Sequence, residues 1–389
     1  MRTQKFRSIT GAAVIFLMVA IVSAQSGGTF NITKSVTGGG GGQSTGGTFT
    51  VDGTIGQPLA GTTSGGGTFI VESGFWTSSP LSLSGTVTYG NAASPPRFIS
   101  NVTLTGAGSP GVATTSNFPD GTYFLSGFGS GAYTVTPTKV GGVNGIASLD
   151  AARISQHVAG PPNPQLNATQ LIVADVSGNT TVSSFDAAMI AKFVAGPPYA
   201  PPGIGSTGTW RFTPTNRAYA SIAGSVAGED YVGLLMGEVS GNWNNTGARS
   251  PESEGPERAV TVKLANVVTA ASHDVIVPIN IEGAVNKGLI SYELELRYDP
   301  TVIQPQAESV SLAGTESRNL LAVTNAIQPG ILRVVVYGPK PIAADGVLLN
   351  LKFTAVGEKG STSPLTLERI VFNEGENRVN TVSGKVEFF

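Results

Sequence analysis

The stretch Ser291-Tyr292-Glu293-Leu294-Glu295-Leu296-Arg297-Tyr298 decides the fold of the C-terminal third of the chain. Polar and apolar residues alternate in it, so successive side chains point to opposite faces of a strand. Further apolar or alternating runs lie at residues 260–264, 275–281, 332–337 and 348–353. Short strands at this spacing predict an antiparallel β-sandwich or jelly roll over residues 259–389.

Composition limits the classes of function. The 389 residues include 52 Gly and 24 Pro but only 12% charged residues, with a formal net charge of −2. The length predicts several domains, and the Gly and Pro content favours turns and short strands. The small charge gives no general attraction to nucleic acid or to an anionic membrane. Two histidines and no cysteine exclude cysteine nucleophiles, cysteine zinc sites and multi-histidine metal centres.

Residues 1–24 are typical of a signal peptide. Arg2, Lys5 and Arg7 precede an apolar run over residues 11–22, and small residues follow before Gln25. The run is short for a membrane span, and an uncleaved anchor is the alternative. We therefore expect a secreted or cell-surface protein with no membrane span in the mature chain.

The remaining chain divides by composition into a mostly β, multi-domain protein. Residues 25–80 repeat Gly-Gly-Thr-Phe three times and predict a Gly-rich β spacer. Residues 81–138 predict a β-sandwich, and the stretch 120–137 resembles the carboxypeptidase-regulatory-like, or prealbumin-like, domains of bacterial surface proteins. Residues 139–250 contain a helix pair and trailing strands that we expect to pack on it. The acidic residues 251–258 contain two prolines and indicate a linker.

Two segments of the helical region repeat each other. Residues 148–162 and 184–198 both begin with Ser, continue with Asp-Ala-Ala and end with Gly-Pro-Pro. Ser and Asp favour a helix start, and Gly followed by Pro favours a helix end. The repeat predicts two short helices that pack face to face.

The strongest chemical motif precedes the second helix. Residues 175–186 fit a twelve-residue calcium loop, because oxygen-bearing groups recur along it and calcium binds six to eight oxygens. The candidate ligands are Asp175, Ser177, Asn179, the Thr181 carbonyl, Ser183 through water, and Asp186. Thr180 replaces the usual Gly and only two ligands are charged, so we expect one site of modest affinity. The alternative is an Asx turn and helix cap without metal. The loop before the first helix is shortened and lacks its first acid, so no strong site is expected there.

This helical region, over residues 139–200, resembles dockerin modules, which are duplicated calcium-loop and helix units of cellulosome assembly. The resemblance rests on the tandem repeat, on residues 175–186 and on the two Ala-Ala helices. It implies that the residues just before each loop-ending Asp contact a cohesin partner. These contact positions are Ser148 and Leu149 in the first repeat and Ser184 and Phe185 in the second.

The C-terminal domain resembles cohesins, the partners of dockerins. The resemblance rests on residues 275–279, 291–303 and 346–353 and covers nearly all of 259–389. It implies a jelly roll that binds a protein or, in related modules, a carbohydrate on one sheet face. Cohesin-like and dockerin-like units in one chain also allow self-association from head to tail.

The sequence therefore predicts a bacterial, extracellular, non-catalytic binding or scaffolding protein linked to polysaccharide-degrading assemblies. Its partner would be a protein of the cohesin or dockerin type, or a polysaccharide. One alternative is a structural surface adhesin or stalk whose helix pair only packs internally. The third reading is a glycoside hydrolase, for which Glu293 and Glu295 are the carboxylate pair.

The positions of Glu293 and Glu295 argue against a glycoside hydrolase. They share one strand face, about 7 Å apart, whereas glycosidases place two carboxylates across a sugar cleft. We expect a solvated strand face beside Arg297. Trp76, Trp210 and Trp243 could stack on sugars or pack at domain edges.

Overall fold

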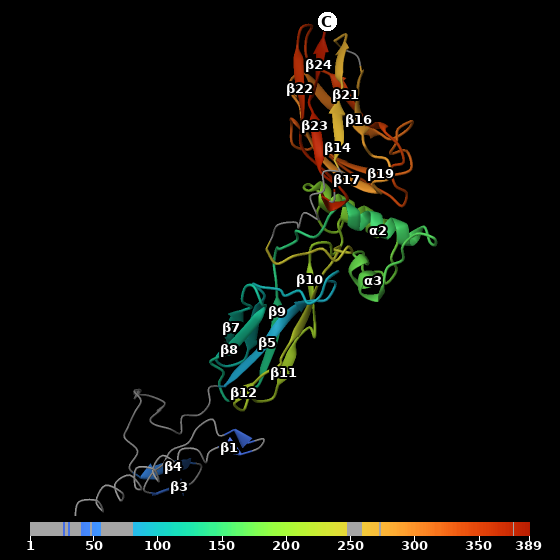
Figure 1. Cartoon of the computed structure of the whole chain (residues 1–389). Coiled ribbons are helices and arrows are strands. Elements are labelled where there is room, and N and C mark those ends of the chain that lie inside the picture. Colours follow the sequence, from blue (N-terminus) through green and yellow to red (C-terminus); the bar gives the residue numbers. More distant parts are fainter. Residues whose placement is uncertain are drawn as a thin grey trace, which may run out of the picture. The chain divides into compact units, whose positions relative to one another are not determined.

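The computed structural model describes residues 26–27, 30–31, 40–46, 49–55, 81–246, 259–271, 274–375 and 377–389. It forms two compact units, residues 1–79 and residues 80–389. Strands dominate the described residues of both units, which confirms the mostly β fold class (Figure 1). No helix in these described ranges is long and apolar enough to cross a membrane.

In the first unit the described residues form two antiparallel strand pairs. β1 (Ser26–Gly27) pairs with β2 (Phe30–Asn31), and β3 (Gly40–Gly46) pairs with β4 (Phe49–Ile55). The predicted signal peptide, the third Gly-Gly-Thr-Phe repeat, Trp76 and the predicted linker lie outside the described residues.

The second unit begins with a two-sheet sandwich. One sheet has the order β10-β13-β5-β12, with β8 also paired to β5, and the other has the order β11-β9-β6-β7. Alternate residues of the strands, such as Leu83, Val87, Leu104 and Leu125, fill the space between the sheets. The strands are β5 (Ser82–Tyr89), β6 (Thr103–Ala107), β7 (Val112–Thr115), β8 (Thr122–Ser126), β9 (Tyr133–Thr138), β10 (Trp210–Thr213), β11 (Arg217–Tyr219), β12 (Ser225–Val226) and β13 (Tyr231–Leu235).

The trailing strands complete this sandwich instead of packing on the helices. β13 runs parallel to β5, and β11 pairs with β9. Residues on both sides of the helical segment therefore share one core. The sequence did not reveal this, because strand patterning does not specify which strands pair.

Three helices lie between the strands of this sandwich in sequence. They are α2 (Ser148–Val158), α3 (Ala168–Ala174) and α4 (Ser184–Ala195), of which the repeat predicted α2 and α4. The Ser183 side chain caps α4 by accepting from the Phe185 N–H, and Gly196 at φ +79° ends it. α2 and α4 pack against each other, as expected from the repeat.

Residues 259–389 form the second sandwich. Its sheets have the orders β18-β21-β16-β14-β23 and β15-β24-β22-β17-β20-β19. The strands are β14 (Val260–Leu264), β15 (Asn266–Thr269), β16 (Asp274–Glu282), β17 (Ser291–Arg297), β18 (Ile303–Ser311), β19 (Leu321–Asn325), β20 (Ile331–Tyr337), β21 (Gly346–Ala355), β22 (Thr362–Phe372), β23 (Val379–Val382) and β24 (Gly384–Phe388). A short 3₁₀ turn, η2 (Asn373–Gly375), follows β22.

Strand β17 lies at the centre of the six-stranded sheet, between β20 and β22. Its Tyr292, Leu294 and Leu296 are buried in the sandwich, as the alternation predicted. Its other face is also largely covered, since Ser291 and Glu293 are buried too. Something outside the sandwich must therefore cover that face.

Candidate functional site

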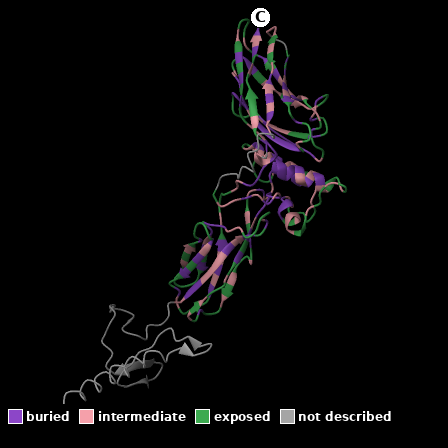
Figure 2. Ribbon diagram, viewed as in Figure 1, coloured by how far each residue is buried: buried purple, intermediate pink, exposed green. Residues whose placement is uncertain are grey.

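The helix pair covers the outer face of this sheet. α2 contacts β17 and β20, and α4 contacts β19 and β20; Figure 1 shows α2 beside β17. We call this the covered face: its outward side chains are Ser291, Glu293 and Glu295 of β17, Val323 and Asn325 of β19, and Arg333, Val335 and Tyr337 of β20. Val335 and Tyr337 belong to the same hydrophobic cluster as the helices, not to the interior of their own sandwich. Much of α2 is correspondingly buried (Figure 2).

Glu293 binds the first turn of α2. Its Oε1 accepts a hydrogen bond from the backbone N–H of Ser148, at 2.9 Å. The first N–H groups of a helix have no partner within the helix, and the helix dipole favours a negative charge at this end. Its other oxygen lies 2.9 Å from the guanidinium of Arg369, on β22. Glu293 is thus a buried carboxylate satisfied partly by the helix.

Asn325 binds the opposite type of helix end. Its side-chain amide donates to the carbonyls of Ala195, Gly196 and Pro197, where α4 ends. The last carbonyls of a helix have no partner within it, and that of Gly196 also accepts from the backbone N–H of Tyr199. The Tyr199 hydroxyl adds a hydrogen bond to the carbonyl of Thr324, at 2.9 Å. One sheet face therefore provides an acceptor for a helix start and a donor for a helix end.

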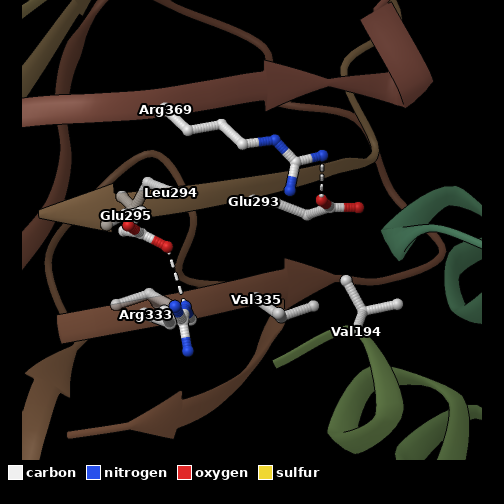
Figure 3. Close-up of a pocket in the computed structure, with 8 residues that line it drawn as sticks. Val194, Glu293, Leu294, Glu295, Arg333, Val335 and Arg369 are labelled. Atoms are coloured by element: carbon white, nitrogen blue, oxygen red, sulfur yellow. Dashed lines mark hydrogen bonds and ion pairs between the residues drawn. The ribbon is translucent and has the colours of Figure 1, made fainter. Parts of the chain in front are cut away.

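A small pocket of about 60 Å³ lies between α4 and the covered face (Figure 3). Val194 projects from α4 toward Val335, and two ion pairs form the opposite wall. Glu295 pairs with Arg333 at 2.7 Å. Such a space accommodates a few water molecules. That is too small for a sugar ring, and both pairs of charges are already satisfied.

This geometry corrects the expectation for the two glutamates. Glu295 is partly exposed, but Glu293 is only 4% exposed and does not lie on a solvated face. The alternation correctly separated the two sides of β17, yet it could not reveal that helices cover the outer side. Neither carboxylate faces the other across a cleft, so the arrangement lacks the acid and base geometry of a glycosidase.

The predicted contact positions divide into two groups. Ser148 and Leu149 are buried, with Ser148 directly on the covered face. Ser184 and Phe185 are exposed, Phe185 at 54%. The first repeat therefore faces the second sandwich of its own chain, and the equivalent residues of the second repeat do not.

The predicted calcium ligands come together in the loop before α4. Asp175 accepts from the backbone N–H groups of Gly178, Asn179 and Thr180, and Asp186 accepts from those of Ser177 and Ser183. All six predicted groups offer oxygen, so the donor chemistry fits a hard cation. The loop is also self-supporting, because its own N–H groups satisfy both carboxylates. No group of three or more Asp, Glu, His or Cys side chains suited to a metal occurs in the described part of the chain.

The loop of the first repeat is supplied by a distant segment that sequence reasoning missed. Residues 238–242, Glu-Val-Ser-Gly-Asn, repeat residues 175–179, Asp-Val-Ser-Gly-Asn. Glu238 accepts from the N–H groups of Gly241 and Asn242, as Asp175 accepts from those of Gly178 and Asn179. Gly241 and Gly178 both have positive φ, at +80° and +73°. This five-residue repeat was the signal that could have revealed the segment.

The segment joins α2 through Asp150, which matches Asp186 of the second repeat. Asp150 Oδ1 accepts from the N–H groups of Val239 at 2.6 Å and Ser240 at 2.8 Å. Asp186 Oδ1 likewise accepts from the N–H of Ser177, at 2.9 Å. The first loop–helix unit is therefore present but discontinuous. The expectation that this loop is simply shortened was wrong.

Asp150 and Glu238 form a buried acidic pair. Both are fully buried, and the Tyr89 hydroxyl donates to Glu238. Burial, reinforced by the charge of Glu238, raises the pKa of Asp150 to about 8. Burial also raises the pKa of Glu238. The pair therefore binds a proton more readily than two separate carboxylates in water.

The tryptophans in the described residues are structural. Trp243 is 1% exposed, and its ring lies 4.9 Å from Tyr89 and 5.1 Å from Trp210 between ring centroids. The ammonium of Lys139 lies over the Trp210 ring, at 5.8 Å from its centroid. These contacts place both indoles in packing roles rather than on an open sugar platform.

Comparison with known proteins identifies the second sandwich. The family model of the cohesin domain matches residues 260–388. None of the curated proteins matches the chain. Similar solved structures include a non-cellulosomal cohesin from Archaeoglobus fulgidus, at 24% identity, covering 34% of this chain and 91% of that one with a TM-score of 0.29. Another is the type I cohesin–dockerin complex Coh-OlpA-Doc918 from Clostridium thermocellum, at 19% identity, covering 34% of this chain and 99% of that one with a TM-score of 0.29.

Proposed function

Because residues 260–388 are a cohesin domain, a non-catalytic binding module, we propose that the chain is a secreted, non-catalytic scaffolding protein that holds a helical protein module on its covered face. The observation that carries this proposal is the pair of helix-end contacts on one sheet. Glu293 accepts from the start of α2, and Asn325 donates to the end of α4. Groups placed in this way recognise helices by their backbone ends.

A protein partner is better supported than a polysaccharide. The pocket beside Val194 holds only about 60 Å³. Trp210 and Trp243 pack against Tyr89, which leaves neither ring free to stack on a sugar. A place in extracellular polysaccharide-degrading assemblies follows from the resemblance to cohesins and dockerins. We include this place in polysaccharide-degrading assemblies in the proposal.

A second candidate function is a structural adhesin or stalk. The observation in its favour is that the chain's own helix pair already occupies the covered face. In this case the contact would serve only to join two sandwiches firmly, and no external partner would be bound.

A binding experiment separates the two candidates. The full chain is immobilised, and a calcium-loaded dockerin module is passed over it, with wild type compared with Ser148→Pro. Proline removes the N–H that Glu293 accepts but leaves the sheet unchanged. We expect the variant to bind about 30-fold more tightly, since weakening the closed contact by about 2 kcal/mol frees the face by that factor.

Ser184→Pro is the matched control, because Ser184 begins α4 and is exposed. It should bind the module as the wild type does. If neither the wild type nor Ser148→Pro binds any dockerin module, the structural candidate replaces the scaffolding one.

We further propose that residues 175–186 bind one calcium ion with modest affinity. Asp175 and Asp186 would supply the two charges, with Ser177, Asn179, Thr181 and Ser183 as further oxygen donors. Calorimetric titration of calcium into the full chain should show binding that Asp175→Ala with Asp186→Ala removes. Asp120→Ala, which changes an Asx-turn carboxylate elsewhere, should bind as the wild type does. Equal heats from the wild type and the double variant would disprove the site.

A further inference from the structure

The contact between the helix pair and the covered face is more polar than either core beside it. Glu293, Asn325 and Arg333 lie on the face, and Glu374 of η2 accepts from the side chains of Ser240 and Asn242. The interior of the cohesin domain, in contrast, consists of aliphatic and aromatic side chains. Contacts between domains that can separate are typically polar in this way.

Buried hydroxyl groups also weaken the closed contact. In the described part of the chain, Ser148 Oγ on α2 and Ser291 Oγ on β17 are buried without a hydrogen-bond partner. A buried polar atom without a partner destabilises the closed state, because water would satisfy it once the surfaces separate. Both atoms favour release of the helices from the face.

A single covalent connection joins the two sides of this contact. The helices belong to residues 81–246 and the covered face to residues 259–389, so residues 247–258 are the only link. Their sequence, Gly-Ala-Arg-Ser-Pro-Glu-Ser-Glu-Gly-Pro-Glu-Arg, is polar and acidic with two prolines. A link of this length spans at most about 40 Å when extended. Separation at the contact would expose Val335 and Tyr337 and would leave the interior of the cohesin domain intact.

We propose that two copies of this chain exchange helix pairs, so that the helices of one copy occupy the covered face of the other. This rests on the proposed function, because it uses the same face, and it names a second copy of the chain as the partner. The incoming helices present the same two ends to Glu293 and Asn325, so every contact of the closed chain is reproduced between copies. Exchange is then favoured by concentration alone.

The absence of cysteine provides a direct test. One full-length variant carries Val194→Cys on α4, and another carries Val335→Cys on the covered face. Both positions line the same pocket, and Val335 is 2% exposed, so a closed chain shields it. After the two variants are mixed and oxidised with glutathione disulfide, we expect a disulfide-linked dimer whose yield rises with protein concentration.

Two further variants complete the design. The chain with both substitutions should close its own disulfide when dilute, which shows that the two thiols meet in a folded protein. Val194→Cys mixed with Ile276→Cys measures random collision, since Ile276 is exposed on the other sheet. If the disulfide-linked dimer is no more abundant than in this control at every concentration, the exchange is overturned. Binding of a dockerin module is a separate measurement, so the proposed function can survive that result.

Discussion

Replacing Ser148 with proline tests how the helix pair is held. Ser148 is the first residue of α2, where proline is well tolerated because its fixed φ suits a helix start. Ala147 before it is extended, with φ −147° and ψ 176°, which is the conformation that proline favours in its neighbour. The substitution therefore removes the N–H that donates to Glu293 and leaves the backbone of the helix unchanged.

The expected magnitude follows from the burial of Glu293. A hydrogen bond to a charged group contributes about 1.5–3 kcal/mol. The Glu293 side chain is 6% exposed and Arg369 is 50% exposed, so the remaining ion pair is partly screened. We expect the closed contact to lose about 2 kcal/mol, which makes its opening about 30 times more frequent.

Thiol labelling measures this opening directly. In a Val335→Cys background the single thiol is buried, so a small disulfide reagent should react only when the helices leave the covered face. Ser148→Pro should accelerate labelling about 30-fold. Ser148→Ala keeps the N–H and removes a buried hydroxyl that has no partner, so it should slow labelling rather than accelerate it.

Strain from the proline ring would also accelerate labelling, even if the hydrogen bond to Glu293 contributed nothing. A cycle with Glu293→Gln separates the two causes, because loss of one shared interaction makes the two effects less than additive, whereas strain adds in full. An unchanged labelling rate in Ser148→Pro, or full additivity in the cycle, would refute the assigned role of Glu293.

Three other predictions concern separate parts of the same unit. Asn325→Ala removes the donor at the end of α4 and should accelerate the same labelling reaction about tenfold, for a loss of about 1.4 kcal/mol; an unchanged rate would contradict the capping role. The folded pKa of Asp150 is raised to about 8, so its contribution to stability is present at pH 4 and is lost as the pH rises toward 8. Thermal unfolding at several pH values should show this loss of stability. A loss of the same size in Asp150→Asn would exclude the buried acid as its source. Gly241→Ala places a Cβ 2.5 Å from a backbone carbonyl at φ +80° and should lower the free energy of unfolding by at least about 2 kcal/mol. In Gly178→Ala the new Cβ meets no atom within 4 Å, so the loss should be about 1 kcal/mol. Calorimetry measures both losses, and equal values would contradict the packing of the first loop.

Local patterns predicted the elements well. Alternation along β17 assigned Tyr292 and Leu294 to the interior, and the Ser-x-Asp-Ala-Ala repeats located α2 and α4. These features depend on neighbours in sequence, which periodicity and capping report. The cohesin resemblance also held, because the family model matches residues 260–388, which contain all three stretches that carried it.

The long-range contacts could not be predicted in this way. The alternation around Glu293 would be the same on a solvated strand as on a covered one. Its burial depends on the helices that cover the outer face of β17, and alternation does not encode them. Glu238 closes the loop of α2 from far along the chain, and only the repeat of its five-residue segment hinted at that role. Strand pairing and through-space capping are decided by tertiary packing.

The discontinuous loop of α2 also affects how the protein is made. Asp150 and Val239 are 89 residues apart, so during synthesis α2 leaves the ribosome well before the segment that supplies donors to its buried carboxylate. The last strands of the first sandwich lie in between, at residues 210–235. The helix and sandwich must therefore acquire their final structure together and late, and a chain cut after β9 would lack part of both. Folding of residues 81–243 would therefore wait until the segment after β13 has been made.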